Sequence, residues 1–366
     1  MRIAQVVAPW LSVPPAGYGG TEGVVHDLTE ELVRRGHDVT LFATGDSRTA
    51  AKLSWVYEKA LGNDGRLTTD PFTLLSQIHP VFTHASAFDI IHVHGIRQAL
   101  FFSDLVATPV VHTLHSTITQ GDASFEKYAI YKSFPKQNYV SISNSQRKGI
   151  PELNYVGTVY NGIDLSEFIV GDGSGGYLAW FGRITPKKGV LEAIAVAKKL
   201  RIPLKISAYI DPVDRQFFDR DVKPELADPA IEFVGEMPRD RRSEFLGKAK
   251  VLLMPIKWHE PFGLVVVETM ACGTPVIAFD RGSMQELINP GKNGFIVSPG
   301  SVLNLTAVDT AGVDAMATAV TTLMALPDEI YQTMRRNCRD HIESSFTVSR
   351  MVDGYEKVYN SLVAKK

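Results

Sequence analysis

The chain has 366 residues, too many for one ordinary hydrophobic core, and this length predicts two domains of about 170 residues each. The formal net charge is −2 and no long Lys/Arg run occurs, so the sequence gives no indication of nucleic-acid binding. The only cysteines, Cys272 and Cys338, lie far apart without metal-ligand spacing, which favours a reduced, cytoplasmic compartment and no metal site.

The hydropathy pattern also favours a cytoplasmic protein. The apolar run at the N-terminus is too short for a signal peptide and lacks a cleavage-type ending. No apolar stretch approaches the roughly 20 residues that a membrane-spanning helix needs. We therefore expect a cytoplasmic protein whose contact with the inner face of the membrane is at most peripheral.

The first half of the chain alternates short apolar runs with helical patterns. A Gly-rich loop follows the first apolar run, and apolar residues then recur at helical spacing over 22–35. The segments between the later runs are also helix-like. The predicted strands are 2–8, 37–44, 89–95, 108–115 and 138–145.

The second half repeats the pattern after a Gly/Asp/Ser-rich linker at 165–176. Its predicted strands are 177–184, 203–210, 230–237, 249–256 and 274–279, and its predicted helices include 189–200, 313–326 and 328–343. The tail at 349–365 is an amphipathic helix that must dock its apolar side. Apolar strands alternating with helices predict two doubly wound α/β domains with parallel sheets. Ligands bind such sheets at the carboxyl ends of the strands, and two facing domains make a cleft.

Glycines follow the first predicted strand. Gly19 and Gly20 precede a helix, and the free N–H groups at a helix N-terminus attract anions. The spacing differs from the G-x-G-x-x-G of dinucleotide enzymes, which disfavours a nicotinamide cofactor. A plain turn explains the pair equally well by itself, but the long loop before it suits substrate contact better.

The second domain opens with a strand followed by basic residues, in the segment GRITPKKG. Arg183 ends the strand, and Lys188 stands just before a helix that starts near Gly189. Cations at this end of a strand would neutralise a diphosphate and the charge that grows as it leaves. For Arg183 and Lys188 we favour that function; for Lys187 we favour a solvated turn.

The segment HEPFGLVVVETMACGTPVIAF at 259–279 carries an acid on either side of a predicted helix start. Pro261 and Gly263 place that start near Leu264, with free N–H groups from Gly263 to Val266. Glu268 lies about 6 Å further along the helix, which suits a ribose diol beside a diphosphate. A first-turn acid favoured by the helix dipole is the alternative, but a carboxylate among valines is costly without a partner.

These motifs together resemble the retaining glycosyltransferases of family 4. Glu260-PFGLVVV-Glu268 followed by ACGTPVIA is similar to their E-x7-E signature, and the resemblance extends over nearly the whole chain. HTLHST, YNGID, FGRITPKKG and FVGEM follow in the family's order and approximate spacing, and the loop SVPPAGYGG resembles a subset of its members.

The resemblance implies the GT-B fold, with Rossmann-like domains facing across a cleft and a C-terminal helix that crosses back to the first domain. The expected domains are 1–163 with 350–366, which would bind the acceptor, and 164–349, which would bind the donor. The substrates would be a nucleotide-sugar donor and a sugar, glycan, lipid or natural-product acceptor, with no cofactor or metal requirement.

The resemblance also implies roles for single residues. Glu260 and His115 would contact the donor sugar, Arg183 and Lys188 would hold the diphosphate, and Glu268 would bind the ribose. The remaining donor contacts would come from Gly19, Gly20, Glu236, Met237, Phe262, Gly263 and Leu264. His92 and His94 lie on a neighbouring strand, where a satisfied core position is at least as good an explanation.

The mechanism implied is front-face displacement with retention, in which a leaving phosphate oxygen takes the acceptor's proton. No Ser-His-Asp or paired-carboxylate hydrolase arrangement stands out to oppose it. UDP-hexose is our first choice of donor and GDP-mannose our second. The alternatives are a sugar-nucleotide epimerase of the same fold and a non-catalytic carbohydrate-binding protein.

Overall fold

The computed structural model describes residues 1–62, 70–118, 125–300 and 305–364, and the chain divides into two compact units. Unit 1 comprises Met1–Ile163 with Thr347–Lys366, and unit 2 comprises Asp164–Phe346. Unit 2 is therefore inserted into unit 1. The returning segment begins at Thr347, where we expected 350, and the Thr347 side chain caps the last helix by accepting from the Arg350 N–H.

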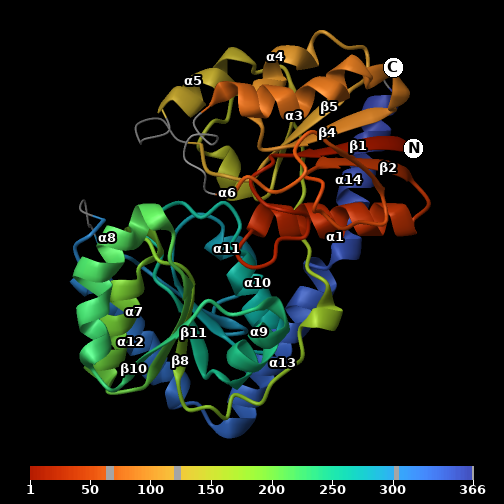
Figure 1. The fold of residues 1–366 in the computed structure, drawn as a ribbon. Helices are drawn as coiled ribbons and strands as arrows, with labels where there is room; N and C mark the ends of the chain where they lie inside the picture. Colours follow the sequence, from red (N-terminus) through yellow and green to blue (C-terminus); the bar gives the residue numbers. More distant parts are fainter. Residues whose placement is uncertain (63–69, 119–124, 301–304, 365–366) are drawn as a thin grey trace. The chain divides into compact units, whose positions relative to one another are not determined.

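Unit 1 is built on a seven-stranded parallel sheet in the order β3-β2-β1-β4-β5-β6-β7. Helices α3, α4 and α5 cover one face of this sheet, and α1 and α14 cover the other (Figure 1). The strands are β1 Arg2–Val7, β2 Asp38–Ala43, β3 Lys52–Trp55, β4 Ile90–His94, β5 Val110–Leu114, β6 Asn138–Ser141 and β7 Tyr155–Thr158. The helices are α1 Gly20–Arg34, α3 Pro71–Thr83, α4 Leu100–Ser103, α5 Phe125–Ser133, α6 Asn144–Arg147 and α14 Val348–Val363.

Strand β1 shows how the sequence divides the core of unit 1 between the two faces. Successive side chains of a strand point to opposite faces. Ala4 and Val6 belong to the apolar cluster that includes Ile78 of α3. Gln5 is fully buried and is hydrogen-bonded to Tyr359 of α14, on the opposite face. At β1, one face of unit 1 is therefore apolar, and the face under α14 carries a buried polar group.

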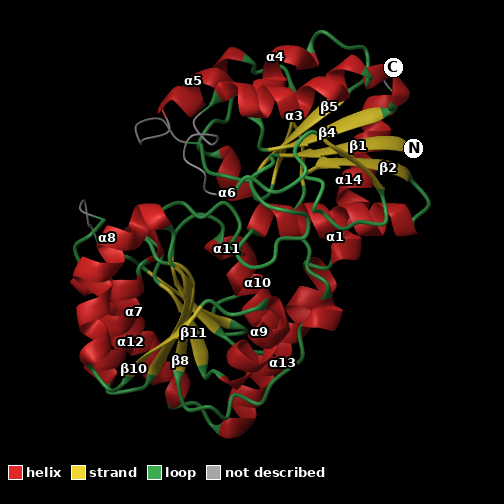
Figure 2. Cartoon of the chain, viewed as in Figure 1, coloured by secondary structure: helices red, strands yellow, loops and turns green. Residues whose placement is uncertain are grey.

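Unit 2 is built on a six-stranded parallel sheet in the order β10-β9-β8-β11-β12-β13, again between helical layers (Figure 2). Helices α7 and α12 lie on one face, and α9, α10 and α13 lie on the other. The strands are β8 Leu178–Arg183, β9 Leu204–Tyr209, β10 Ile231–Gly235, β11 Val251–Met254, β12 Val276–Phe279 and β13 Gly294–Val297. The helices are α7 Val190–Leu200, α8 Arg215–Phe217, α9 Arg239–Lys248, α10 Leu264–Ala271, α11 Met284–Leu287, α12 Thr310–Met324 and α13 Asp328–Ser345.

The strand order reverses once in each sheet, between β1 and β4 in unit 1 and between β8 and β11 in unit 2. The loops at the carboxyl ends of such neighbouring strands diverge and leave a crevice, which is where doubly wound sheets bind ligands. The positions to inspect for function are therefore the loops that follow these strands.

The predicted parallel sheets with both faces covered are confirmed in each unit. The strands that our sequence analysis missed are β3, β7 and β13, and each of them is the edge strand of its sheet. Edge strands are covered on fewer sides, and most residues of these three are partly exposed. β3 (KLSW) and β7 (YVGT) lack the continuous apolar run by which buried parallel strands are recognised, and β13 (GFIV) is apolar but only four residues long.

Candidate active site

The loops after β8 and β11 bring together two charged residues that are 72 positions apart in the sequence. β8 leads into the short turn Pro186–Lys188, and β11 leads into the segment 255–263 before α10. β8 and β11 are parallel neighbours in the sheet. The reversal of strand order in unit 2 therefore places Lys188 and Glu260 at the same crevice.

The carboxylate of Glu260 is held through one of its oxygens. Oε2 accepts hydrogen bonds from Nζ of Lys188 at 2.5 Å and from Nε1 of Trp258 at 3.0 Å. The same ammonium lies 5.2 Å from the centroid of the Trp258 ring, within cation–π range. Glu260 is 7% exposed. No described residue is hydrogen-bonded to its other oxygen, Oε1, which therefore keeps its capacity to accept a hydroxyl proton.

The backbones of the two loops pack directly against each other. A Cβ at Gly189 would lie 1.9 Å from the carbonyl oxygen of Pro255, so only glycine permits this approach. The N–H of Lys257 donates to the carbonyl of Lys187 at 2.8 Å. This contact fixes the turn that carries Lys188.

The loop after β12 supports Glu260 from another side. The N–H of Ser283 donates to the carbonyl of Glu260 at 3.0 Å, and its hydroxyl donates to the carbonyl of Phe262 at 2.5 Å. A Cβ at Gly282 would lie 2.2 Å from the Glu260 carbonyl oxygen. The loop after β12 thus holds the backbone at Glu260, while Lys188 and Trp258 hold its carboxylate.

A buried ion pair anchors the β11 loop. Nζ of Lys257 lies 2.5 Å from Oε1 of Glu192, a residue of α7, and the two side chains are 7% and 1% exposed. Lys257 also donates to the carbonyls of Leu305 and Ala307, and Glu192 accepts from the N–H of Asp309. Buried charges persist only when they are paired and hydrogen-bonded in this way. Our sequence analysis did not identify this pair.

Helix α10 begins at Leu264, as predicted, and Gly263 caps it with a positive φ of 95°. The prediction that N–H groups remain free as far as Val266 is wrong, because the Val266 N–H donates to the carbonyl of Gly263 at 3.0 Å. No described group accepts from the N–H groups of Leu264 or Val265. These groups carry the partial positive charge of the helix N-terminus beside Glu260.

Glu268 lies one turn inside α10 and has a poorly matched partner. Its Oε1 is 3.3 Å from a guanidinium nitrogen of Arg242 on α9, and the two side chains are 12% and 15% exposed. Neither Oε2 of Glu268 nor Nε of Arg242 has a partner among the described residues. Burial raises the pKa of the Glu268 carboxyl, and the nearby Arg242 only partly opposes this shift. The carboxyl is thus buried with an oxygen that is ready to accept a hydrogen bond.

Arg183 stands at the carboxyl end of β8, where its charge is balanced by acids. It bonds Asp214 at 2.6 Å and lies 3.3 Å from Asp211. Glu236 and Met237 follow the end of β10, and Glu236 is exposed. The structure thus places these three predicted residues at carboxyl ends of strands in unit 2.

The predicted glycines of unit 1 lie at the start of α1. Gly19 precedes the helix, and Gly20 is its first residue. A Cβ at Gly19 would lie 2.7 Å from Cβ of Pro15 and 2.9 Å from Cδ1 of Leu11. The loop that follows β1 can therefore fold back on itself only because Gly19 has no side chain.

Histidines gather at the carboxyl ends of β4 and β5. Nε2 of His115 lies 2.9 Å from Nδ1 of His94. His94 and His92 are 2% and 0% exposed, and both ring nitrogens of each are hydrogen-bonded, in agreement with a satisfied core position. His115 is only partly buried and lies beyond the end of β5, at the crevice of unit 1. Burial lowers its pKa to about 4, so the ring is neutral at pH 7.

Another histidine, His112 of β5, should make the stability of the folded protein depend on pH. It is 4% exposed and bonded to the hydroxyl of Ser103 at 2.9 Å, and burial lowers its pKa from 6.5 to about 3. Below pH 6.5 His112 becomes protonated in the unfolded chain but stays neutral in the folded chain. The free energy of unfolding therefore decreases as the pH falls toward 3.

We expect the stability loss between pH 7 and pH 5 to be smaller by about 2 kcal/mol in His112→Asn than in the wild type. Asparagine retains a hydrogen-bond donor but does not titrate in this range. Urea unfolding at both pH values gives the loss of unfolding free energy for each protein, and the two losses are then compared. An equal loss in the two proteins would assign the pH dependence to other groups.

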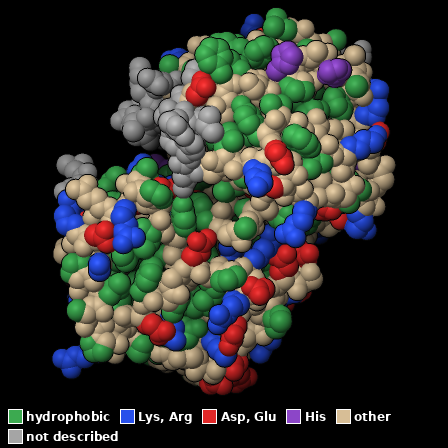
Figure 3. Space-filling view, in the orientation of Figure 1, with side chains coloured by type: hydrophobic (Ala, Val, Ile, Leu, Met, Phe, Trp, Pro, Cys, Tyr) green, Lys and Arg blue, Asp and Glu red, His purple; other side chains and the backbone are tan. Residues whose placement is uncertain are grey.

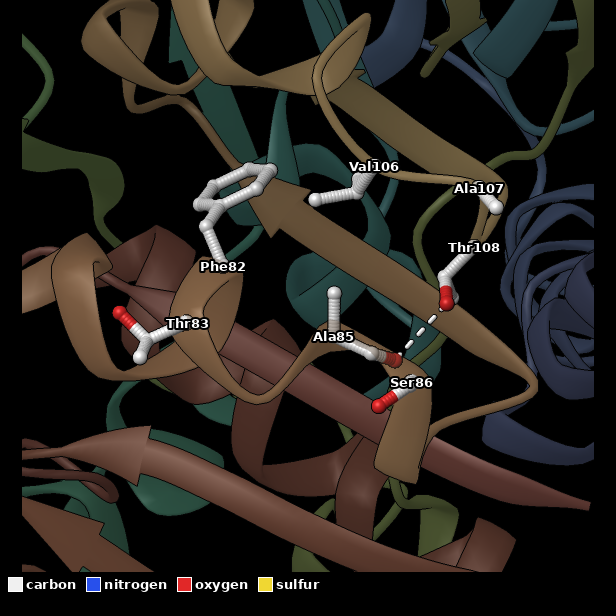
Figure 4. Close-up of a pocket in the computed structure, with 7 residues that line it drawn as sticks. All are labelled: Phe82, Thr83, Ala85, Ser86, Val106, Ala107 and Thr108. Atoms are coloured by element: carbon white, nitrogen blue, oxygen red, sulfur yellow. Dashed lines mark hydrogen bonds between the residues drawn. The ribbon is translucent and has the colours of Figure 1, made fainter.

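A cavity of about 290 Å³ lies elsewhere in unit 1, near the amino-terminal ends of β4 and β5 (Figure 4). Its polar groups are hydroxyls, and that of Thr108 already donates to the carbonyl of Ala85 at 2.8 Å. Its lining residues are Phe82, Thr83, Ala85, Ser86, Val106, Ala107 and Thr108. It carries no charged side chain and lies at the end of the sheet opposite the binding crevice.

Lys and Arg side chains are interspersed with Asp and Glu on the face shown in Figure 3. Within the described parts of the chain, no group of three or more His, Cys, Asp or Glu residues is arranged to hold a metal ion. Among the helices that the structure describes, none combines the length and apolar character that crossing a bilayer requires.

Comparison with known families finds two matches that together cover most of the chain. Residues 18–167 match the family described as Glycosyltransferase Family 4, and residues 172–338 match Glycosyl transferases group 1. The alpha-maltose-1-phosphate synthase of Mycolicibacterium smegmatis is 26% identical, over 98% of this chain and 100% of that protein. The N-acetyl-alpha-D-glucosaminyl L-malate synthase of Bacillus anthracis is 25% identical, over 98% and 97%.

Solved structures share the fold over the full length. Sucrose-phosphate synthase from Thermosynechococcus elongatus superimposes with a TM-score of 0.81 at 19% identity, covering 100% of both chains. HepE of Anabaena, crystallised with UDP and glucose, superimposes with a TM-score of 0.73 at 18% identity, covering 99% of this chain and 100% of HepE.

Proposed function

Because the chain belongs to the glycosyltransferases of family 4 and is an enzyme of GT-B fold, we propose that it is a retaining hexosyltransferase with a nucleotide-diphosphate sugar as donor. UDP-hexose is the first choice, supported by the UDP and glucose in the HepE structure, and GDP-mannose is the second. The acceptor is a hydroxyl of a sugar, glycan, lipid or natural product.

The observation that carries the proposal is the Lys188–Glu260 pair beside the N-terminus of α10. An ammonium has three protons, and Glu260 accepts one of those of Lys188. The others remain for phosphate oxygens, together with the N–H groups of Leu264 and Val265. Fixed donors of this kind stabilise the negative charge that develops on a leaving diphosphate.

The two glutamates supply acceptors for hydroxyl groups. Oε1 of Glu260 accepts from a hydroxyl of the donor sugar, and Oε2 of Glu268 accepts from the ribose. Both carboxylates are anchored by a neighbouring cation through one oxygen, Glu260 by Lys188 and Glu268 by Arg242, which leaves the other oxygen for substrate. Such anchoring places the acceptors before the substrate arrives, so little ordering remains to be done on binding.

In the proposed reaction the bond between the anomeric carbon and the phosphate oxygen breaks while the acceptor oxygen bonds to the same face of that carbon. The electron pair of the broken bond stays on the diphosphate, beside Lys188. The proton of the acceptor hydroxyl passes to the leaving phosphate oxygen. The sugar keeps its anomeric configuration, and the reaction proceeds without a base from the protein.

The test is a panel of UDP-, GDP- and ADP-hexoses, first as ligands in a thermal-shift screen and then as donors with simple acceptors. A nucleotide that binds only the folded state raises its stability and identifies the base. Transfer, or slow hydrolysis of the donor with nucleotide release, is expected. Epimerised donor without transfer would indicate an epimerase, and glycan binding without nucleotide binding would indicate a carbohydrate-binding protein.

A substitution at Glu268 tests the ribose contact. Glu268→Ala removes the buried carboxyl that would accept the ribose hydroxyls, so we expect nucleotide affinity to fall about 10- to 100-fold, as for the loss of hydrogen bonds to a charged group. Isothermal titration with the nucleotide identified by the screen measures the change. Glu329→Ala, which removes an exposed acid from α13, controls for net charge. Equal affinity in the wild type and Glu268→Ala would reject the role of Glu268.

A further inference from the structure

The side chain of Trp258 contacts both members of the Lys188–Glu260 pair. Its indole nitrogen, Nε1, donates to Oε2 of Glu260 at 3.0 Å, and its ring centroid lies 5.2 Å from Nζ of Lys188. The same Nζ donates to the same carboxylate oxygen at 2.5 Å. We call these three residues the Trp258 cluster. Each of its members touches the other two, and all three belong to unit 2.

The direction of each hydrogen bond in the Trp258 cluster is fixed by the chemistry of its donor. An indole N–H and an ammonium can donate, but neither has a lone pair with which to accept. Oε2 of Glu260 is therefore the acceptor in both bonds. No exchange of donor and acceptor roles is possible, so the two bonds can be made in only one sense.

The backbone beside Trp258 is anchored in two places through its neighbour Lys257. The buried ammonium of Lys257 is paired with Glu192 of α7 at 2.5 Å, and the Lys257 N–H donates to the carbonyl of Lys187 at 2.8 Å. The second bond joins the segment that carries Trp258 to the turn that carries Lys188. The indole is thus attached to a part of the β11 loop that is itself held in place.

The indole N–H restrains the carboxylate of Glu260. With Lys188 as its single donor, the carboxylate could swing about that one bond, because the lysine stem is flexible. A second donor, on the β11 loop itself, holds the plane of the carboxylate and with it the direction of Oε1. Hydrogen bonds to a charged group are roughly twice as strong as those between neutral groups, so this restraint is effective.

The indole ring restrains the ammonium of Lys188. Lysine carries its charge on a flexible four-carbon stem, and the charge stays in one place only when neighbouring groups confine it. A cation within about 6 Å of the centroid of an aromatic ring is attracted to the face of that ring, most strongly for tryptophan. The 5.2 Å contact thus adds to the bond with Glu260 in confining the ammonium.

We propose that Trp258 is a positioning residue: its indole N–H orients the Glu260 carboxylate, and its ring confines the Lys188 ammonium, before the donor binds. Its effect on turnover rests on the proposed function, in which Oε1 of Glu260 accepts from the donor sugar and Lys188 faces the leaving diphosphate. Groups that are already in place need no reorganisation when charge develops in the transition state.

The first test is made on the free protein. Selective ¹⁵N labelling of the four tryptophans gives four indole N–H signals, and the signal absent from Trp258→Phe is that of Trp258. We expect this proton to shift upfield and to exchange faster with water in Glu260→Ala, because it loses its acceptor. The indole signal of Trp55, which is 54% exposed on β3, should not change. A Trp258 signal that is the same in the wild type and in Glu260→Ala would overturn the proposal.

The second test separates the indole N–H from the ring, using the nucleoside diphosphate that the thermal-shift screen identifies. Trp258→Phe keeps an aromatic ring and removes the donor, so we expect kcat to fall about tenfold while affinity for the nucleoside diphosphate stays unchanged. Trp258→Leu also removes the ring, so this affinity should fall about two- to fivefold as well, with affinity for the nucleoside unchanged. Trp55→Phe makes the same change at an exposed tryptophan and should alter neither quantity.

The outcomes distinguish the two roles of Trp258 from each other and from a merely structural role. Unchanged kcat in Trp258→Phe, or equal losses of kcat and nucleotide affinity, would overturn the role of the indole N–H. Equal nucleotide affinity in Trp258→Phe and Trp258→Leu would overturn the role of the ring. A merely structural role would lower the free energy of unfolding, measured with urea, and leave kcat of the folded protein unchanged. Absence of transfer by the wild type would instead reject the proposed function, because the NMR test needs no substrate.

Discussion

Glu260→Ala is expected to lower kcat about 100- to 1000-fold, the range found when one fixed polar group is removed from a catalytic site. The carboxylate both places the Lys188 ammonium and offers Oε1 to the donor sugar. The nucleotide has its own contacts with Glu268 and the α10 N-terminus in the proposed complex. Its affinity should therefore change much less than turnover, which steady-state kinetics and nucleotide titration measure separately.

Glu260→Gln separates charge from hydrogen bonding at this position. Glutamine keeps an oxygen that accepts from the sugar and fills the same space, but it removes the charge opposite Lys188. We expect an activity between those of the wild type and Glu260→Ala. A loss of nucleotide affinity as large as the loss of kcat would contradict the assignment of Glu260 to the sugar.

Lys188→Met is expected to lower kcat/KM about 100- to 1000-fold by removing the cation that faces the leaving diphosphate. The side chain keeps its length and its apolar stem. Affinity for a nucleoside diphosphate should fall more than affinity for the corresponding nucleoside, since only the former carries the phosphates. Competitive binding of the two ligands to the wild type and the variant measures this difference.

Lys187→Met is the matched control for this substitution. Lys187 is the preceding residue and is exposed, and its contact with the β11 loop is made by its backbone carbonyl, which the substitution retains. It should leave kcat/KM nearly unchanged. Equal losses at Lys187 and Lys188 would mean that general positive charge near the site, rather than the Lys188 ammonium, supports turnover.

The parts of the site that the sequence predicts are those with local signals. Pro261 and Gly263 mark a helix start, and α10 does begin at Leu264. The identities of Glu260 and Lys188 were also predicted, each from its own motif. Their direct contact was not predicted, because it depends on β8 and β11 being neighbours in the sheet. The order of strands in a sheet cannot be predicted from the sequence of a single segment.

The residues that were missed act through contacts far apart in the sequence. Arg242, which faces Glu268, lies in a polar helix whose run of arginines looks like an ordinary solvated surface. The pairing of Lys257 with Glu192 joins a loop to a distant helix. Glu192 lies among apolar residues of α7, and nothing in the sequence identified its partner.

Glu268 shows where a physical argument from sequence succeeds in part. Its apolar neighbours indicated that a carboxylate there needs a partner, for which our sequence analysis favoured a ligand; in the structure Arg242 lies 3.3 Å away. The match is incomplete, since Oε2 has no described partner and burial still raises the pKa of the carboxyl. The sequence indicated that the carboxylate needs a partner, but only the structure shows the geometry of its pair with Arg242.

The insertion of unit 2 into unit 1 has a consequence for biosynthesis. The seven strands of the first sheet precede unit 2 in the sequence, yet α14, which covers their polar face, follows the whole of unit 2. Until then Gln5 and His92 lack the Tyr359 hydroxyl as a partner, and the face of the sheet that carries them is not covered by α14. Unit 2 thus has its complete sequence while unit 1 is still open, and unit 1 can finish folding only after unit 2 has been synthesised.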